Sequence, residues 1–129
     1  MSDTPKVSLP PVEFSFELSC SGEDTNQKFE GRFVYRRLTI GKKAEVNIAY
    51  NRLKQSTESV SEIIDNVLYM SAYLKFGLIE SPDWWKESNS GLDLFDSAPV
   101  MELFLKVQEF EKSWHEQVFG KLEDEKKPK

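Results

Sequence analysis

The chain has 129 residues, of which 39% are hydrophobic and 30% charged, a balance typical of one folded domain rather than of a disordered chain. Its single cysteine, Cys20, excludes an internal disulfide, and no apolar run approaches the ~20 residues of a membrane-spanning helix. The first residues also lack the apolar core of a secretion signal, so we expect a soluble protein of the cytoplasm.

The net charge of −5 conceals an uneven distribution. Between Lys28 and Lys54, eight Lys and Arg residues against two Glu leave this segment at +6, and subtracting it from −5 leaves the remainder at −11. Such a division predicts a positive zone that attracts a charged partner, although Lys and Arg also cover the outer faces of ordinary strands and helices. The candidate basic patch consists of Arg32, Arg36, Arg37, Lys42 and Lys43.

Alternation of apolar and polar residues predicts two strands at the start of the domain. From Val12 to Cys20, apolar side chains alternate with Glu and Ser, which is the period of a strand with one buried face. A second strand is expected from Lys28 to about Leu38, and one face of it carries Phe29, Gly31, Phe33 and Tyr35. The turn-forming residues between them favour an antiparallel hairpin. Helices or another subunit must cover its apolar face, because a lone hairpin is marginal in water.

Two helices are expected after the hairpin. Thr39 is placed to cap the first, from Ile40 to about Gln55, because its hydroxyl can accept from the free amides of the first turn. The apolar residues near one face of this helix are Ile40, Ala44, Ile48 and Leu53. The capping-box sequence from Ser59 to Glu62 predicts the start of the second, and Gly77 its end. The apolar positions of this second helix are Val60, Ile63, Ile64, Val67, Leu68 and Leu74.

A short helix is expected from Ser81 onward, with Ser81 as its cap and a proline in its first turn. It carries Trp84 and Trp85, which point in different directions because they are adjacent. One of them is therefore expected to be buried, and the other to be half exposed as a packing residue or as an anchor for a partner. Residues 86–96 are expected to form an irregular connection.

The last helix is expected to be capped by Asp96 or Ser97 and to end near Phe119, before Gly120. Its continuous apolar stripe consists of Val100, Leu103, Phe104, Val107, Phe110, Trp114 and Val118. A helix with such a stripe is typical of one that covers a sheet or packs on other helices.

These elements predict a single α+β domain over residues 12–120, with an N-terminal antiparallel hairpin followed by three to four helices. Residues 1–11 contain three prolines and no periodic pattern, which indicates a flexible lead. The charged residues 121–129 indicate a disordered tail.

The sequence offers few residues for catalysis. The only histidine, His115, has no evident nucleophile or orienting partner, and Cys20 lies far from it in sequence. Asp93 and Asp96 resemble a carboxylate pair, but loop aspartates commonly cap helices. No glycine-rich phosphate loop, nucleophile elbow or zinc-binding spacing is present in the sequence. We expect no enzymatic activity, no metal and no cofactor.

A nucleic-acid interface is the next alternative. Arg32 and Arg36 interleave with Phe33 and Tyr35, a mixture that proteins binding single strands use. The strand period, however, places the rings on the buried face and the arginines on the outer face. The chain is also acidic overall, unlike most such domains, so nucleic acid is the less favoured partner.

Short motifs in the middle of the chain carry a family resemblance. An aromatic and basic strand leads into an R-x-L-T-I-G passage; later come a P-x-W-W passage and an acidic cap before a helix rich in aromatic residues and glutamate. The matching residues are Arg36, Leu38, Thr39, Ile40, Gly41, Pro82, Trp84, Trp85 and the segment from Asp96 to Trp114. From Phe29 to about Trp114, this order resembles that of the tail assembly chaperones of tailed phages.

The resemblance implies a non-enzymatic protein of phage or prophage origin that acts in the host cytoplasm. Members of that family are thought to bind the tape measure protein and keep it soluble while tail tube proteins polymerise around it. The sequence leaves a homo-oligomer open. The candidate partner-binding residues are Tyr73, Phe76, Trp84, Trp85, Phe95, Phe104 and Trp114, most of which also suit a core.

Two rivals remain open. A small virion protein, such as a tail completion or connector protein, is also compact and non-enzymatic, but it stays in the purified particle. A nucleic-acid-binding adaptor needs the basic patch and loses affinity steeply as the salt concentration rises.

Overall fold

The computed structural model describes residues 9–55 and 60–126, with side chains described as far as Gly120. Within these ranges the chain forms an antiparallel sheet and four helices, which confirms the predicted α+β class. In chain order the strands are β1 (Glu13–Ser21), β2 (Lys28–Arg36) and β3 (Leu78–Glu80). The helices are α1 (Ile40–Gln55), α2 (Glu62–Gly77), α3 (Asp83–Lys86) and α4 (Ala98–Lys126).

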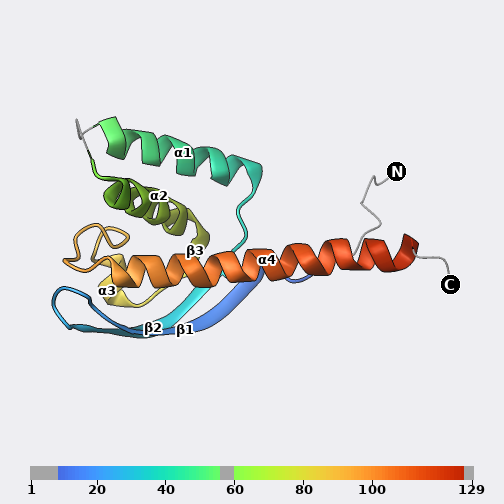
Figure 1. Cartoon of the computed structure of the whole chain (residues 1–129), viewed down its shortest axis with the longest axis horizontal. Helices are drawn as coiled ribbons and strands as arrows, with labels where there is room; N and C mark the ends of the chain where they lie inside the picture. The colour runs from blue at the N-terminus through green and yellow to red at the C-terminus, as the bar shows by residue number, and fades with distance from the viewer. Residues whose placement is uncertain (1–8, 56–59, 127–129) are drawn as a thin grey trace.

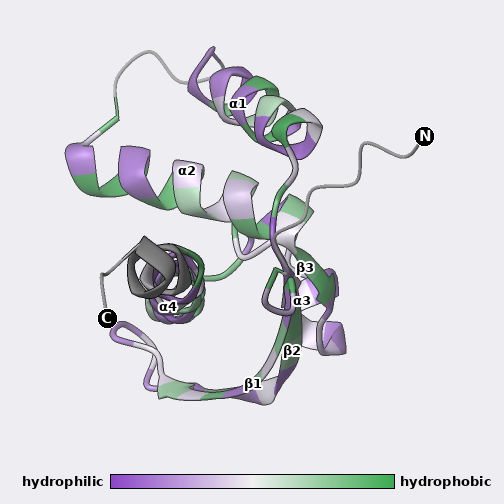
Figure 2. Ribbon diagram, turned by 90° about the vertical axis from the view of Figure 1, so that its right-hand side faces the viewer, coloured by the Kyte–Doolittle hydropathy of each residue, from purple (hydrophilic) through white to green (hydrophobic). Residues whose placement is uncertain are grey.

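The elements are stacked in layers, with the sheet at one side of the domain and α1 at the other. Figure 2 shows α4 lying across the curved sheet, α2 crossing over α4, and α1 packed on the outer side of α2. In Figure 1, α4 runs along the length of the domain and extends past the sheet. The last helix is thus the central layer, with the hairpin on one side and α2 on the other.

The predicted hairpin is confirmed. β1 and β2 pair antiparallel over their full length, from Glu13 opposite Arg36 to Ser21 opposite Lys28. β3 was not predicted, because three residues directly after a helix show no strand period; it pairs with β2 next to Val34 and Tyr35. The sheet order β1-β2-β3 leaves β1 at one edge.

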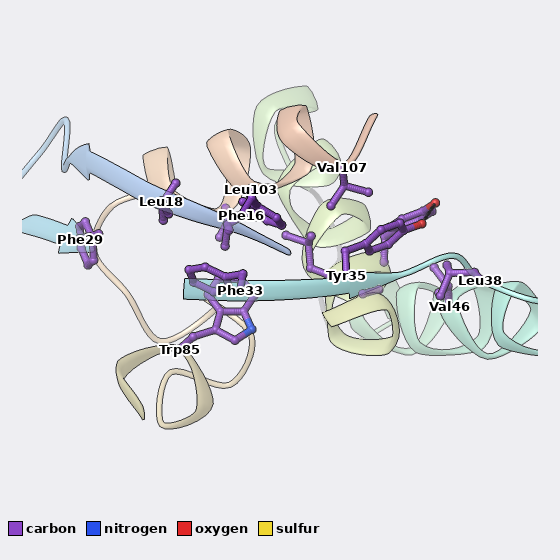
Figure 3. Close-up of a cluster of buried hydrophobic side chains, with 14 residues drawn as sticks. Phe16, Leu18, Phe29, Phe33, Tyr35, Leu38, Val46, Trp85, Leu103 and Val107 are labelled. Carbon is purple, nitrogen blue, oxygen red and sulfur yellow. Dashed lines mark hydrogen bonds between the residues drawn. The ribbon is translucent and has the colours of Figure 1, made fainter. Parts of the chain in front are cut away.

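The core lies between the hairpin and α4 (Figure 3). Phe33 and Tyr35 on β2 are fully buried, as the strand period predicted, and they belong to the same apolar cluster as Leu103 and Val107 of α4. Burying a large apolar side chain contributes about 1.5–3 kcal/mol, so these residues are important for the stability of the domain. Further buried members of the core are Phe16, Leu18, Phe29, Leu38, Val46, Ala72, Tyr73, Leu74, Trp85 and Val100.

The predicted bounds of α1 are confirmed, but the prediction of its buried apolar face was wrong. The amide of Lys42 donates to the Thr39 hydroxyl at 3.3 Å, so Thr39 caps the helix as expected. Ile40 and Ile48 are 88% and 53% exposed, and the fully buried residue is Val46. Ala49 and Tyr50, one turn further on, pack partly against the core with it. The buried side of α1 therefore consists of smaller and more polar residues than the sequence pattern indicated.

The start of α2 also differs from the prediction. Ser61, not Ser59, is the N-cap, and its hydroxyl accepts from the amide of Ile64 at 3.3 Å; Ser59 lies outside the described residues. The predicted end at Gly77 is confirmed. The buried residues are Ser71, Ala72, Tyr73, Leu74 and Gly77, all in the second half of the helix. Ile63 and Ile64, which the pattern placed on the apolar side, are 67% and 48% exposed.

The predicted cap of α3 was wrong, and so was one of the two alternatives for α4. Pro82, not Ser81, occupies the N-cap position of α3. Asp96 does not cap α4: its carboxylate accepts from the amides of Asp24 and Thr25 in the β1–β2 turn, at 2.7 and 3.0 Å. The free amides at the start of α4 donate instead to Glu23 of that turn. Ser97 does occupy the position before the helix, and its hydroxyl donates to Glu23 at 2.8 Å.

The last helix is longer than predicted. α4 continues through Gly120 to Lys126, so the end expected near Phe119 was wrong. A glycine costs a helix interior only about 1 kcal/mol, which neighbouring helix-forming residues can offset. The charged residues after Gly120 are therefore helical as far as Lys126, and residues 1–8 and 127–129 lie outside the described residues.

Candidate functional site

A groove lies between α1, α2 and α4. Its volume is about 630 Å³, which is in the range of ligand-binding clefts. The residues that line it are Leu38, Lys43, Val46, Asn47, Tyr69, Tyr73, Phe104, Gln108, Glu111, Lys112 and His115. Leu38 and Val46 are buried at its closed side, whereas Lys43, Asn47, Gln108, Lys112 and His115 are exposed along its rim.

One wall of the groove is a straight face of α4. Phe104, Gln108, Glu111 and His115 follow one another at spacings of four, three and four residues, and Lys112 lies beside them. These spacings place the side chains on one side of a helix. Eleven residues at about 1.5 Å each give this wall a length of about 16 Å, or three helical turns. The opposite wall is the first half of α1, with Lys43, Val46 and Asn47.

The floor of the groove is aromatic. Tyr69 and Tyr73 are one turn apart on α2, and the ring of Phe104 stands edge-on to both, with centroids 6.3 and 5.5 Å away. Tyr69 is 37% exposed and Tyr73 nearly buried, so the floor slopes from the solvent toward the core. Edge-to-face aromatic pairs have defined geometry, so this floor is a preformed surface rather than a loose cluster.

A polar network closes one end of the groove. The Tyr35 and Tyr73 hydroxyls are 2.9 Å apart, and Tyr35 also donates to Glu111 at 3.4 Å. The Nε of Arg37 donates to both Glu111 oxygens, at 3.0 and 2.8 Å, and its guanidinium lies 3.6 Å from the centre of the Trp114 ring. Burial is the main cause that raises the pKa of both tyrosines, so their hydroxyls stay protonated and serve as hydrogen-bond donors and acceptors.

The network places His115 beside the same guanidinium. Its Nε2 lies 3.4 Å from the Arg37 terminal nitrogen, and its ring meets the Trp114 ring at 77°. His115 was expected to be structural, and its contacts with Arg37 and Trp114 are of that kind. It also lies exposed on the groove rim, which the sequence did not indicate.

The predicted partner-binding residues are not brought together on one surface. Tyr73 and Phe104 line the groove, and Trp114 lies behind it under Arg37. Phe76 is half buried, with the ammonium groups of Lys42 and Lys75 at 6.0 and 5.6 Å from its ring. Phe95 is 84% exposed in the connection before α4, and it does not line the groove.

The two adjacent tryptophans pack against the sheet. Trp85 is buried and meets the ring of Phe33 edge-on at 6.1 Å. Trp84 is half buried, packs against Phe29 at 5.2 Å, and donates its indole N–H to the Glu30 carbonyl at 2.8 Å. Trp85 is thus the buried member of the pair, as one of them was expected to be, and the exposed part of Trp84 lies away from the groove.

The basic residues are also divided. Arg32 donates to the Ser15 hydroxyl at 3.0 Å, and Arg36 lies opposite Glu13 in the register of the hairpin. Both arginines are exposed on the outer side of the sheet. Arg37 turns toward Glu111, Lys42 pairs with Glu45 at 3.2 Å, and Lys43 lies on the groove rim. The +6 segment therefore does not form one continuous patch.

Besides Leu38, which precedes α1, seven groove residues on the helices were not among the predicted site residues: Val46, Asn47, Tyr69, Gln108, Glu111, Lys112 and His115. Their signal was weak because they belong to three helices far apart in sequence. The series from Phe104 through Gln108 and Glu111 to His115 has helical spacing, but it lies on the flank of the more apolar stripe that determined the prediction.

Among the side chains that the structure describes, in residues 9–55 and 60–120, no group of three or more from His, Cys, Asp or Glu is arranged to hold a metal ion. None of the helices in these ranges is both long and apolar enough to traverse a bilayer. No model of a known protein family, no curated protein and no solved structure matches the chain.

Proposed function

We propose that the protein is a non-enzymatic binding protein that holds a helical segment of a partner protein in the groove between α1, α2 and α4. The observation that carries this proposal is the combination of an aromatic floor with a straight wall about three helical turns long. An amphipathic helix binds such grooves through apolar residues spaced by three and four positions. Tyr69, Tyr73 and Phe104 would receive these residues.

The polar groups of the groove support binding rather than catalysis. The Glu111 carboxylate is already engaged by Arg37 and Tyr35, and the Tyr73 hydroxyl lies within hydrogen-bond distance of Tyr35. Groups that satisfy one another in this way hold the walls in place, and they are poorly placed to exchange protons with a substrate. We therefore propose a protein that binds without reaction.

The sequence resemblance suggests which partner to test. We propose that the chain acts in the host cytoplasm as a tail assembly chaperone of a tailed phage, with the tape measure protein as the bound helix and the tail tube protein polymerising around it. A tape measure protein presents long helices with apolar stripes, which is the kind of ligand that this groove fits. This proposal depends on the order of motifs from Arg36 to Trp114.

The nucleic-acid alternative receives no support from the aromatic residues of β2. Phe33 and Tyr35 are both fully buried, so they offer no face on which a base could stack. Arg32 and Arg36 remain on the outer side of the sheet without rings beside them on β2. The experiment must therefore distinguish a chaperone from the remaining alternative, a small virion protein.

The test compares two tryptophan substitutions on α1. Asn47→Trp fills the groove, whereas Asn51, one turn further along α1, is also exposed and does not line the groove, so Asn51→Trp leaves it open. Each tagged variant is coexpressed with the tape measure protein of the same phage, and the soluble tape measure protein that copurifies is measured.

The native chain and Asn51→Trp are expected to retain the tape measure protein, and Asn47→Trp to lose it. Equal retention by both variants would contradict the groove as the binding site. Purified virions decide the remaining alternative: a chaperone is absent from them, whereas stoichiometric recovery of this chain would make it a virion component.

A further inference from the structure

The charged residues on the groove are unbalanced. Lys43 lies on the α1 wall and Lys112 on the α4 wall, both exposed, and neither is in an ion pair with another described residue. Of the other lysines with described side chains, Lys28, Lys42 and Lys54 pair with acidic residues, whereas Lys75, Lys86 and Lys106, which do not line the groove, are in no ion pair with a described residue. The groove therefore presents one uncompensated positive charge on each wall.

Glu111, the only carboxylate among the described residues that line the groove, does not neutralise these two lysines. Glu111 is 15% exposed and is held by the Nε of Arg37 at 2.8 Å, so this pair contributes no net charge. The remaining polar groups of the rim, on Asn47, Gln108 and His115, are hydrogen-bonding groups. A ligand thus meets an apolar floor flanked on both sides by ammonium groups.

We propose that the groove selects an acidic amphipathic helix, with an apolar stripe on the Tyr69, Tyr73 and Phe104 floor and Asp or Glu residues on both flanks of that stripe. This inference rests on the proposed function, because it specifies the chemistry of the helix that the groove receives. The carboxylates on one flank reach Lys43 and those on the other reach Lys112. A helix about three turns long spans the α4 wall, so each flank needs only one or two acidic residues.

The charge of the rest of the chain adds selectivity to this arrangement. The protein has a net charge of −5, so the molecule as a whole repels an acidic helix at long range. Lys43 and Lys112 offset this repulsion at the groove, where the helix can also bury its apolar stripe on the aromatic floor. A basic helix would be attracted to the acidic surface in general and repelled at the groove itself.

The test uses three stapled helices of about 15 residues, enough for the ~16 Å wall plus one turn. All three carry the same Leu and Phe stripe, and their flanking positions are Glu, Gln or Lys. Binding to the full chain is measured by fluorescence anisotropy at roughly 0.05 M and 0.5 M salt, because the Debye length shortens over this range. The Asn47→Trp variant reports whether each helix occupies the groove.

We expect the Glu-flanked helix to bind about fivefold more tightly than the Lys-flanked helix at the lower salt concentration, with the Gln-flanked helix between them. The difference should shrink at the higher salt concentration. Lys112→Glu and Lys43→Glu should each reduce or reverse it. Lys86→Glu is the matched control, since it makes the same charge change on α3, away from the groove, and should preserve the preference.

The remaining outcomes are distinguishable. Groove binding that is equal for all three helices, or tightest for the Lys-flanked one, overturns the acidic preference and leaves the proposed function standing. Failure of all three helices to bind contradicts both. A dimer of the native chain that Lys112→Glu dissociates would show that a second copy occupies the groove, and it would also overturn the inference.

Discussion

Glu23 and Asp96 each accept hydrogen bonds from backbone amides that lie next to the other residue in the chain. Glu23, in the β1–β2 turn, accepts from the amides of Ser97 and Ala98 at the start of α4. Asp96, just before α4, accepts from the amides of Asp24 and Thr25 in that turn. The two carboxylates thereby fix the hairpin turn to the helix start by a reciprocal exchange of caps.

Acid is expected to weaken this exchange. The Thr25 hydroxyl and the amides of Asp24 and Thr25 lower the pKa of Asp96 despite its burial. Burial acts to raise the pKa of Glu23, but hydrogen bonds from its own amide, from the Ser97 hydroxyl and from the Ser97 and Ala98 amides lower it overall. A carboxyl whose pKa is lowered by folding stabilises the fold above its ordinary value and loses that contribution as the pH falls through the folded value.

The free energy of unfolding should therefore decrease as the pH drops below the ordinary pKa values, which are 4.5 for Glu23 and 3.8 for Asp96. Urea unfolding followed by circular dichroism at a series of pH values measures this. Glu23→Gln, which has no ionisable carboxyl at this position, should cost about 1 kcal/mol at neutral pH and show a smaller loss in acid. An identical acid slope in the native chain and in the variant would contradict the contribution of Glu23.

Gly22 is required by the position of Asp96. A Cβ at residue 22 would overlap the Asp96 carboxylate, which must stay in place to bind the turn. Gly22→Ala is expected to lower the free energy of unfolding by 1 kcal/mol or more, estimated as roughly the lower end of the cost of overpacking a well-packed site.

Gly41→Ala is the matched comparison. A Cβ at residue 41, in the first turn of α1, meets only the Thr39 hydroxyl at 4.0 Å. Alanine favours a helix by about 0.5–1 kcal/mol relative to glycine, so this variant should be more stable than the native chain. Thermal unfolding of both variants gives the comparison, and a loss of stability on Gly41→Ala would show that α1 is not packed as described.

Arg37 is expected to be the most sensitive arginine of the chain. Its side chain is 19% exposed, and its removal leaves the Glu111 carboxylate without its ion-pair partner and the Trp114 ring uncovered. Arg37→Ala should lower the free energy of unfolding by about 2–4 kcal/mol. Arg37→Lys should recover only part of this loss, because an ammonium does not stack and bind a carboxylate as a planar guanidinium does.

Arg36→Ala provides the control for this measurement, since Arg36 is the exposed neighbour on the outer side of the sheet. Its effect should lie within about 0.5 kcal/mol. Urea unfolding of the three variants decides the matter. Similar losses of unfolding free energy for Arg36→Ala and Arg37→Ala would show that the polar network at the end of the groove does not stabilise the fold.

The orientation of α1 gives a further prediction. Val46→Ala deletes two buried methyl groups at 2% exposure and should cost about 1–2 kcal/mol. Ile48→Ala deletes more carbon at 53% exposure and should cost less than about 0.5 kcal/mol. If Ile48→Ala were the more damaging of the two, α1 would pack through the face that the sequence pattern had indicated.

Local patterns predicted the elements of this fold well. The alternation of apolar and polar residues around Phe16 and Phe33 indicates which face of each strand is buried, because successive side chains of a strand point to opposite faces. Thr39 indicates the start of a helix because its hydroxyl accepts a hydrogen bond from the amide of Lys42, three residues later. The predicted buried face of α1 was wrong because the prediction relied on large apolar residues such as Ile40 and Ile48. This helix packs mainly against α2, and both isoleucines are exposed.

The features that depend on distant parts of the chain were not predictable in this way. Asp96 has the composition and position of a local helix cap, but it binds a turn more than 70 residues away. The groove joins Lys43, Tyr69 and Gln108, and no spacing within a single helix relates them. The resemblance directed attention to the tryptophans, of which Trp84 and Trp85 pack on the sheet rather than on the groove.

The position of α4 between the sheet and α2 has a consequence for the order of events during synthesis. The hairpin leaves the ribosome before α4, and Phe16, Leu18 and Phe33 are buried beneath this helix, which begins 65 to 82 residues after them. The hydrogen bonds from Thr25 to Asp96 and from Tyr35 to Glu111 join residues 71 and 76 apart. Until α4 is made, the nascent chain carries an uncovered apolar strand pair. Contacts of such long sequence separation also slow folding relative to a simple helical bundle. The domain is therefore expected to fold in one late step once α4 has emerged, and a ribosome that stalls before that helix would hold an aggregation-prone fragment.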